Sequence, residues 1–171
     1  YILDTAVTFE VDVPSSEEYK RRVAEICGYY PYLAWVENGS ILGYAYATRH
    51  HERTGYRYDV STSIYLAPHV QGKGIGRRLY SCLLEVLKAQ GMQNAYAIIT
   101  LPNEKSMGLH TTLGFATVGI FRRTGRKFDA WLDVALMEKT LGDFPEPPPP
   151  LIGVRDLPPE IWERLGVRCH G

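Results

Sequence analysis

Residues 59–101 combine a strand, a glycine-rich turn, a helix and a second strand, and this unit constrains the fold more than any other segment. Asp59–Leu66 alternates apolar and polar side chains, which predicts a strand. From Gly74 to Gly91 the apolar residues recur at helical spacing, and residues 95–101 read as a short apolar strand. Two strands joined through a helix normally lie parallel in one sheet. We therefore expect a parallel pair of strands in the middle of the chain.

The segments on either side of this unit predict antiparallel pairing. Two apolar runs flank Asn38-Gly39, a dipeptide typical of hairpin turns. Near the end of the domain, two strands are expected to be joined by a loop that contains Gly125. The expected elements here are helices at 15–26 and 103–113, and strands at 32–37, 41–47, 115–122 and 131–137. The order predicts an α/β (α+β) fold, with a mixed, mostly antiparallel sheet flanked by helices.

The composition changes after Leu141. Residues 146–150 contain a polyproline run, which is extended and stiff, and a short helix is expected at 159–165. A chain of 171 residues suits one domain with a tail. We therefore expect one domain over residues 1–141 and a proline-rich C-terminal tail over residues 142–171.

Charge and cysteine content exclude several classes of protein. Lys plus Arg and Asp plus Glu both number 19, so the chain lacks the basic excess typical of a nucleic-acid partner. No stretch approaches the roughly 20 apolar residues that a membrane span needs. The three cysteines are scattered, and the histidines, including His50-His51, lack a metal-binding spacing, so no metal is expected. The start lacks a secretory signal, which predicts a cytoplasmic location, and it lacks an initiator Met, which suggests a trimmed chain.

The glycine-rich turn is the segment that most clearly indicates a ligand-binding site. In Gln71–Gly76 three glycines alternate, so the backbone can turn tightly and approach a ligand closely. The free N–H groups at the start of the following helix would form an anion site, with positive charge from Lys73, Arg77 and Arg78. A Walker loop would need Lys-Ser or Lys-Thr after Gly76, and the spacing also fits a dinucleotide-binding GxGxxG loop poorly.

The pattern Gln71-x-x-Gly74-x-Gly76 resembles the pyrophosphate loop of the GCN5-related N-acetyltransferases (GNAT), which bind acetyl-CoA. Residues 63–68, 79–91, 101–103, 110–115 and 125–133 look like the phosphinothricin N-acetyltransferase branch of that superfamily. The resemblance covers about residues 4–139. It implies the GNAT fold, in which the parallel pair splays apart around acetyl-CoA. The family's first strand and part of its first helix would precede Tyr1 and be missing here.

The resemblance assigns residues to the cofactor. Ile64, Tyr65 and Leu66 would line the acetyl and pantetheine arm, with their backbone bonding it like an added strand. Asn103 would bind the pantetheine region through its amide, although its residue type equally suits a helix N-cap. The pyrophosphate would lie on Gly72, Lys73, Gly74, Ile75, Gly76 and Arg77.

Two positions concern proton transfer. His110 stands where this branch has a histidine that could return a proton to the CoA thiolate. The alternative is that His110 is an ordinary core or surface histidine without a catalytic role. Ser61 stands where the branch carries a glutamate that accepts the proton of the amine. Asp59, on the same strand face, could replace it through a water. Otherwise the amine loses its proton to solvent, or His110 serves as the base.

An amino-acid-like acceptor would need a cation for its carboxylate. Arg57 matches the branch, and Arg53, Arg126 and Lys127 are further candidates, although each could be a solvated surface charge. Phe9 and Trp131 could wall the pocket or pack in the core.

The resemblance therefore implies an acetyl-CoA-dependent N-acetyltransferase acting on a small amine such as phosphinothricin, methionine sulfoximine or methionine sulfone. One alternative is an acetyltransferase for a polyamine or a protein N-terminus. Another is a CoA-binding protein without turnover, motivated by Ser61 and the missing first strand. A homodimer is also expected from the family, and the proline-rich tail could strap across a partner subunit.

Overall fold

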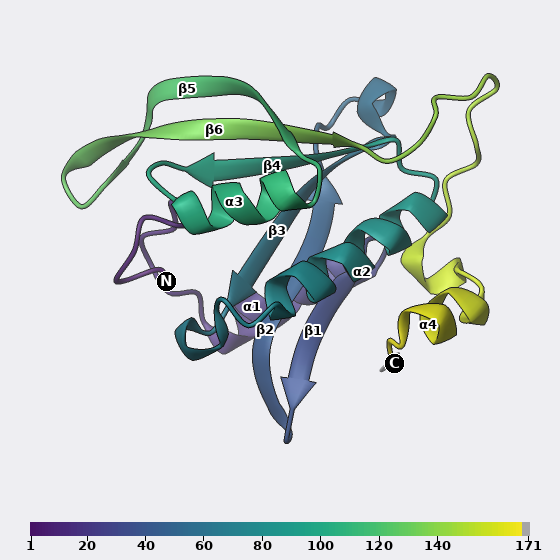
Figure 1. Ribbon diagram of the computed structural model, residues 1–171, viewed down its shortest axis with the longest axis horizontal. Coiled ribbons are helices and arrows are strands. Elements are labelled where there is room, and N and C mark those ends of the chain that lie inside the picture. The colour runs from purple at the N-terminus through teal and green to yellow at the C-terminus, as the bar shows by residue number, and fades with distance from the viewer. Residues whose placement is uncertain (169–171) are drawn as a thin grey trace.

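Six strands form one sheet in the order β1-β2-β3-β4-β6-β5 in a computed structural model that describes residues 1–168 (Figure 1). Every neighbouring pair is antiparallel except β3 and β4, which are parallel. The predicted mixed, mostly antiparallel sheet with a central parallel pair is thus confirmed. The strands are β1 (Tyr32–Glu37), β2 (Ser40–Arg49), β3 (Asp59–Leu66), β4 (Asn94–Thr100), β5 (Ala116–Lys127) and β6 (Ala130–Thr140).

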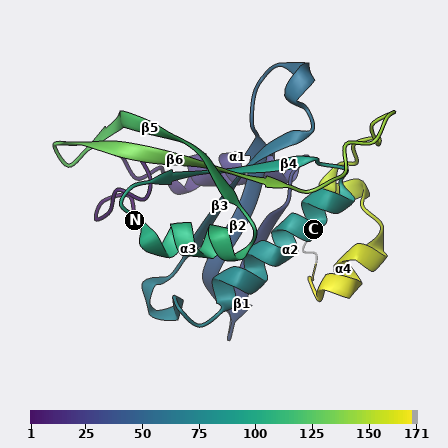
Figure 2. The same ribbon diagram turned by 45° about the horizontal axis from the view of Figure 1, so that its top comes forward.

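Helices cover both faces of this sheet. Figure 1 shows α2 and α3 in front of the strands and α1 behind them, and Figure 2 gives the same arrangement from another angle. Ser15 caps α1, because its side chain accepts a hydrogen bond from the backbone N–H of Glu18. None of the helices among residues 1–168 is long and apolar enough to cross a membrane. The helices are α1 (Ser16–Cys27), α2 (Ile75–Ala89), α3 (Glu104–Thr112) and α4 (Pro159–Leu165).

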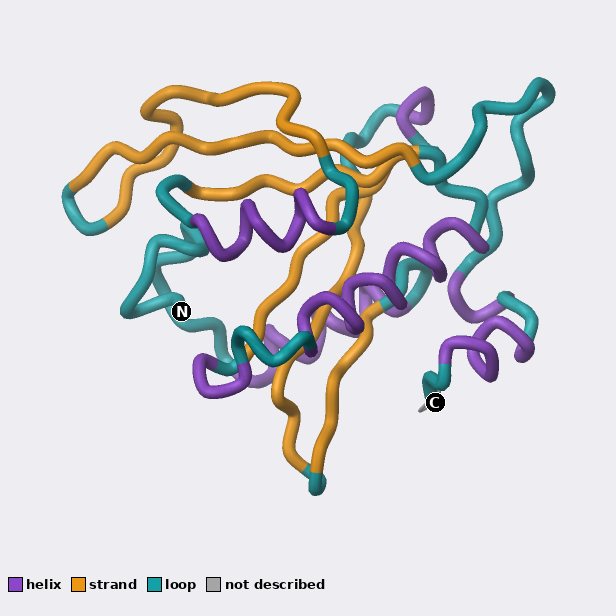
Figure 3. Tube along the Cα trace, viewed as in Figure 1, coloured by secondary structure: helices purple, strands orange, loops and turns teal. Residues whose placement is uncertain are grey.

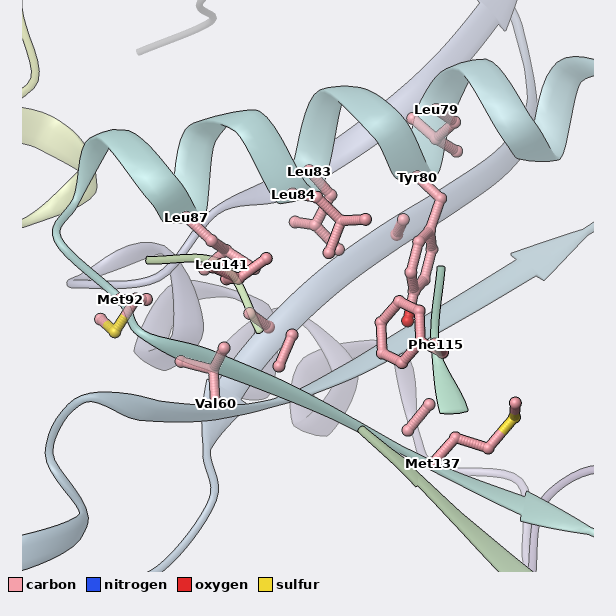
Figure 4. Close-up of a cluster of buried hydrophobic side chains, with 14 of the residues drawn as sticks. Val60, Leu79, Tyr80, Leu83, Leu84, Leu87, Met92, Phe115, Met137 and Leu141 are labelled. Atoms are coloured by element: carbon pink, nitrogen blue, oxygen red, sulfur yellow. The ribbon is translucent and has the colours of Figure 1, made fainter. Parts of the chain in front are cut away.

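The main core lies between α2 and the sheet (Figure 4). Leu83 and Leu87 of α2 are completely buried, and each such side chain contributes roughly 1.5–3 kcal/mol on burial. On the sheet they meet small side chains, Ala45 and Ala47 of β2, which are also completely buried. Small residues on the sheet let the helix approach closely. The core therefore holds α2, and the turn that precedes it, firmly against β2 and β3.

The hairpin of β5 and β6 corrects one prediction. Gly125 does not lie in a loop but within β5, where it pairs with Leu132. The chain turns later, at Phe128 and Asp129, which both have positive φ angles. Gly125 serves packing instead, because a β-carbon there would lie 2.0 Å from the ring of Phe9. A glycine that makes room for an aromatic ring resembles a turn glycine in sequence.

The C-terminal tail packs against its own chain, beside the C-terminal end of α2 (Figures 1 and 3). The Gln90 side chain donates hydrogen bonds to the backbone oxygens of Tyr29 and Ile152. Leu157 is buried, and Trp162 of α4 packs against the main core. Helix α4 begins and ends where the sequence predicted. Of the three cysteines, Cys27 and Cys82 are free thiols, and Cys169 lies outside the described residues.

Candidate active site

The parallel pair opens into a cleft. β3 pairs with β4 over only three residue pairs, which end at Ser61 opposite Tyr96, whereas it pairs with β2 as far as Leu66. From residue 62 onward, the β3 edge that faces β4 is therefore open, and an extended ligand could bond to it like an added strand. A cavity of about 50 Å³ lies in this opening. Its walls include Thr62, Ser63, Ile64, Tyr65, Ile98, Thr100, Asn103 and His110.

The pleat of β3 separates the three residues that were predicted to line the cofactor arm. Ile64 and Leu66 point toward α2, since a β-carbon on Gly76 would lie 3.8 Å and 2.9 Å from their terminal methyl groups. Tyr65 points to the opposite face, where its ring centroid lies 5.3 Å from that of Tyr44. Ile64 thus lines the α2 side of the cleft, with Leu66 farther along the same strand face, and Tyr65 lines the α1 side.

The glycine-rich turn has the conformation of an anion-binding loop. Gly72 and Gly74 adopt φ angles of 75° and 80°, which L side chains rarely adopt. Gly74 is the N-cap of α2, and its carbonyl accepts the N–H of Arg78. The backbone N–H groups of the preceding three residues, Ile75 to Arg77, lack partners within the helix and point out of its N-terminus. Such groups bind phosphate well.

The charged side chains around this turn divide into two groups. Lys73 and Arg77 are exposed beside it. Arg78 instead places its guanidinium over the ring of Trp35, 4.9 Å from the centroid, so it is already engaged. Gly76 is buried and allows α2 to pack closely on Leu66. The turn therefore offers backbone donors and two free cations to an anion.

The structure shows one of the two roles that were predicted for Asn103. Its side-chain oxygen accepts the N–H of Ser106 at 3.1 Å and so caps α3. The same side chain lines the cleft cavity. Since the cap uses the oxygen, the amide nitrogen is left to donate toward a ligand.

His110 is buried, with 3% of its surface exposed, and belongs to a chain of hydrogen bonds. Its Nδ1 lies 2.8 Å from the carbonyl oxygen of Ser106, which can only accept, so Nδ1 carries the proton. Its Nε2 lies 3.0 Å from the hydroxyl oxygen of Tyr80, and Thr62 Oγ1 lies 2.6 Å from the same hydroxyl, whose single proton can bond to one of the two at a time. Thr62 in turn donates to the backbone oxygen of Tyr96. Burial lowers the pKa of His110, so the ring is neutral at neutral pH.

At the closed end of the cleft, Ser61 meets a histidine that was not among the predicted site residues. The hydroxyl of Ser61 lies 2.9 Å from Nδ1 of His50. The His50 ring stacks on Tyr96, with centroids 4.1 Å apart and planes 13° apart. Asp59 accepts a hydrogen bond from the Asn94 side chain at 3.0 Å. The sequence contained the His50-His51 doublet, but it was weighed there only as a metal ligand.

The chain is similar to known proteins over most of its length. The profile of the acetyltransferase (GNAT) domain family matches residues 1–136. The chain belongs to this acetyltransferase family. It is 37% identical over 145 residues to a phosphinothricin N-acetyltransferase of Streptomyces coelicolor, which covers 82% of this chain and 85% of the relative. It is also 37% identical over 118 residues to an L-methionine sulfoximine/L-methionine sulfone acetyltransferase of Salmonella typhimurium, covering 69% of each chain.

A solved structure agrees with the fold of this acetyltransferase. The crystal structure of a GNAT superfamily phosphinothricin acetyltransferase from Sinorhizobium meliloti in complex with AcCoA superposes with a TM-score of 0.80. The two sequences are 40% identical, and the match covers 82% of this chain and 77% of the other. The predicted family, fold and enzyme class are thus confirmed.

A second, larger cavity lies on the α1 face of the acetyltransferase. It has a volume of about 360 Å³, and Tyr65 belongs to its wall as well as to the cleft. Arg22 also lines it and forms salt bridges with Glu10 and Glu18. Burial raises the pKa of Tyr65 to about 12, so its hydroxyl stays neutral. The other tyrosines in the wall are Tyr1, Tyr19, Tyr32, Tyr44 and Tyr46.

Two predicted substrate residues hold the N-terminal segment in place. The ammonium of Lys127 is buried and donates to the backbone oxygens of Thr8 and Glu10, both at 2.7 Å. Phe9, between them, packs against Gly125 of β5. Both side chains are thus engaged by the chain itself.

The other predicted substrate residues lie apart from the two cavity walls described above. Arg57 is exposed, with its guanidinium over the ring of Tyr58. Arg126 pairs with Asp129, Arg53 is exposed before a short 3-10 turn, and Trp131 is 61% exposed. Within residues 1–168, no group of three or more His, Cys, Asp or Glu side chains could hold a metal ion.

Proposed function

We propose that this chain transfers the acetyl group of acetyl-CoA to the primary amine of a small amino-acid-like molecule. The observation that carries the proposal is the open edge of β3 beside the Gly72–Arg77 turn, in a chain that matches acetyltransferases over most of its length. The turn would take the pyrophosphate on its backbone N–H groups, and the open edge would take the pantetheine arm. Relatives named for phosphinothricin and for methionine sulfoximine or sulfone support the acceptor class.

The chemistry is direct attack of the amine on the thioester carbonyl. A backbone N–H of the open β3 edge polarises that carbonyl and stabilises the oxyanion. The carbon–sulfur bond then breaks, and CoA leaves as a thiolate that takes up a proton.

We assign the return of this proton to His110, acting with the hydroxyl of Tyr80 that lies between its Nε2 and Thr62 in the cleft wall. The imidazole must first be protonated at Nε2. Because burial lowers the pKa of His110, this form is scarce at neutral pH, and His110 contributes less than an exposed histidine would.

The acceptor would approach from the α1 face, since Tyr65 borders both the cleft and the tyrosine-lined cavity. Its carboxylate needs a cation. Arg57 is the candidate from the family resemblance, and Arg22 is the candidate from the cavity wall. Glu10 and Glu18 already pair with Arg22, so a carboxylate must compete with them.

A mass-spectrometric acetylation screen tests the proposal. The chain is incubated with acetyl-CoA and phosphinothricin, methionine sulfoximine, methionine sulfone, ordinary amino acids, polyamines and an N-terminal peptide. We expect acetylated amino-acid analogues together with release of free CoA. Acetylation of only the polyamine or the peptide would overturn the acceptor class. Binding of acetyl-CoA without release of thiol would identify a non-catalytic binding protein.

The proposal includes a homodimer in the cytoplasm. Its support is the edge strand β5, where Val118, Ile120 and Phe121 are each at least 43% exposed. Apolar side chains gathered on an exposed strand are typical of an interface. Sedimentation equilibrium of the wild type and of Phe121→Glu tests this, because only a dimer through β5 would dissociate in the variant.

A further inference from the structure

We propose that Ser61 and His50 together form the base that accepts the proton of the acceptor amine. The serine hydroxyl would face the amine, and the imidazole of His50 would take the proton through it. This inference rests on the proposed function. It gives the chain a base at the position where the family resemblance implies a glutamate and where the sequence has a serine.

Ser61 stands at the closed end of the cleft. It is the last β3 residue that pairs with β4, so the cleft begins directly after it. Side chains alternate along a strand, which places Ser61 on the same face as Ser63 and Tyr65. Those two residues line the cleft cavity, and Tyr65 also lines the larger cavity of the α1 face. An amine that entered from this face would reach Ser61 at the closed end of the cleft.

His50 is held against Ser61 by the register of the sheet. Thr48 lies opposite Ser61, and His50 follows two residues later, directly after the end of β2. Its ring is stacked on Tyr96 on one side, and the His51 ring meets it edge-on at 4.3 Å. The imidazole is therefore positioned by packing, with Nδ1 2.9 Å from the serine oxygen. A serine hydroxyl that donates to Nδ1 leaves Nε2 to carry the proton of the neutral ring.

The surroundings of His50 suit a base at neutral pH. Burial and the neighbouring His51 lower the pKa of His50, so the ring is neutral and can accept a proton. The charge of Asp59 acts in the opposite direction and stabilises the imidazolium once it forms. The other titratable and charged groups near His50 come from three places. They are Tyr96 of β4 with its partner Glu138 of β6, Tyr56 beside His51, and the Arg49–Glu52 ion pair.

The proton balance is as follows. The substrate ammonium gives one proton to Ser61 Oγ while the serine gives its own proton to His50 Nδ1, which forms an imidazolium and a neutral amine. The amine nitrogen then bonds to the thioester carbon, and the carbon–sulfur bond breaks. The second nitrogen proton passes to solvent as the amide forms. The thiolate takes up one proton from His110, which regains a proton from solvent. His50 releases its proton to solvent before the next turnover.

The test is the pH dependence of a single turnover, with acetyl-CoA bound in advance and phosphinothricin or methionine sulfone as acceptor. For the wild type, we expect a rate that falls as pH drops through the pKa of His50, below the ordinary value of 6.5. His50→Gln should lower the plateau rate about 100-fold and remove this acidic limb, since general bases contribute roughly 10²–10⁴-fold. His50→Phe, which keeps an aromatic ring on Tyr96, should do the same.

Two further variants separate a base from a structural residue. His51→Gln, the matched control beside His50, should keep the limb. Ser61→Glu placed in the His50→Gln background should raise the rate at least 10-fold and restore an acidic limb near the ordinary pKa of a carboxyl group, about 4.3. A limb that persists in both His50 variants would overturn the assignment, as would a double variant no faster than His50→Gln.

The controls also separate this inference from the proposed function. Acetyl-CoA affinity should be unchanged in all four variants, because His50 and Ser61 lie on the face opposite the phosphate-binding turn. If the wild type acetylates none of the amines, the proposed function has failed. If the wild type turns over and the His50 variants keep its pH profile, only this inference has failed.

Discussion

The two faces of the cleft are built by different means. On the α2 side, the candidate cofactor site consists of backbone: the glycine turn, the first N–H groups of α2 and the open edge of β3. On the α1 side, the candidate acceptor site consists of side chains from distant segments, among them Arg22, Tyr44, His50 and Tyr65. A backbone site tolerates changes of side chain but not of conformation. A side-chain site can change its ligand while the fold stays the same.

This comparison predicts the largest effect at Gly74. Its φ of 80° strains any L residue, while nothing lies within 4 Å of an added β-carbon. We expect Gly74→Val to distort the turn, at a cost of about 2 kcal/mol, and to weaken acetyl-CoA binding roughly 30-fold in calorimetry. Gly39→Val is the matched control, because Gly39 has a φ of 75° with equal space around it but lies in the β1–β2 turn. Equal loss of affinity in both variants would show that the effect comes from stability alone.

A variant of Lys127 tests whether its buried ammonium binds the acceptor or stabilises the fold. Its buried ammonium satisfies two backbone oxygens, so Lys127→Met should lower the free energy of unfolding by about 2 kcal/mol in urea titrations. Arg126→Met, next to it but exposed, should stay within about 0.5 kcal/mol of the wild type. If Lys127→Met raised the KM of the acceptor and left the free energy of unfolding unchanged, Lys127 would belong to the substrate site after all.

His110 lies at the boundary between the two sides. Since its ring is mostly neutral, we expect His110→Gln to lower kcat about 10-fold while acetyl-CoA affinity changes less than 2-fold. Tyr80→Phe removes only the hydroxyl that lies next to Nε2 and should give a similar loss if the two act together. Steady-state kinetics at pH 7 would measure both, and an unchanged kcat in His110→Gln would exclude it from the reaction.

The smallest effect is expected at Arg22, in the wall of the tyrosine-lined cavity. Arg22→Gln should raise the KM of an amino-acid acceptor about 5-fold and leave the affinity for acetyl-CoA unchanged. Arg21→Gln is the matched control, because Arg21 also pairs with Glu18 but is absent from that wall. Equal KM values for both variants would assign carboxylate binding elsewhere, with Arg57 the next residue to test.

Local signals accounted for most of the fold. The N-cap at Asn103, the Asn38-Gly39 hairpin and the change from strand to helix at Gly74 were read from neighbouring residues, and the structure has them at those places. The hairpin of β5 and β6 was the exception. Gly125 of that hairpin makes room for the ring of Phe9, which lies more than a hundred residues earlier in the chain. No local sequence pattern could therefore reveal why a glycine stands there.

The sequence by itself determined the parallel pair, the glycine-rich turn and the family, because each shows in short motifs of neighbouring residues and in their backbone preferences. Only the tertiary structure decided that His50 meets Ser61, that six tyrosines surround one cavity, and that Lys127 holds the N-terminal segment. These contacts join strands and segments that are far apart in sequence. They depend on strand register and on the side of the sheet that each residue faces, which side-chain alternation alone leaves open until the strands are paired.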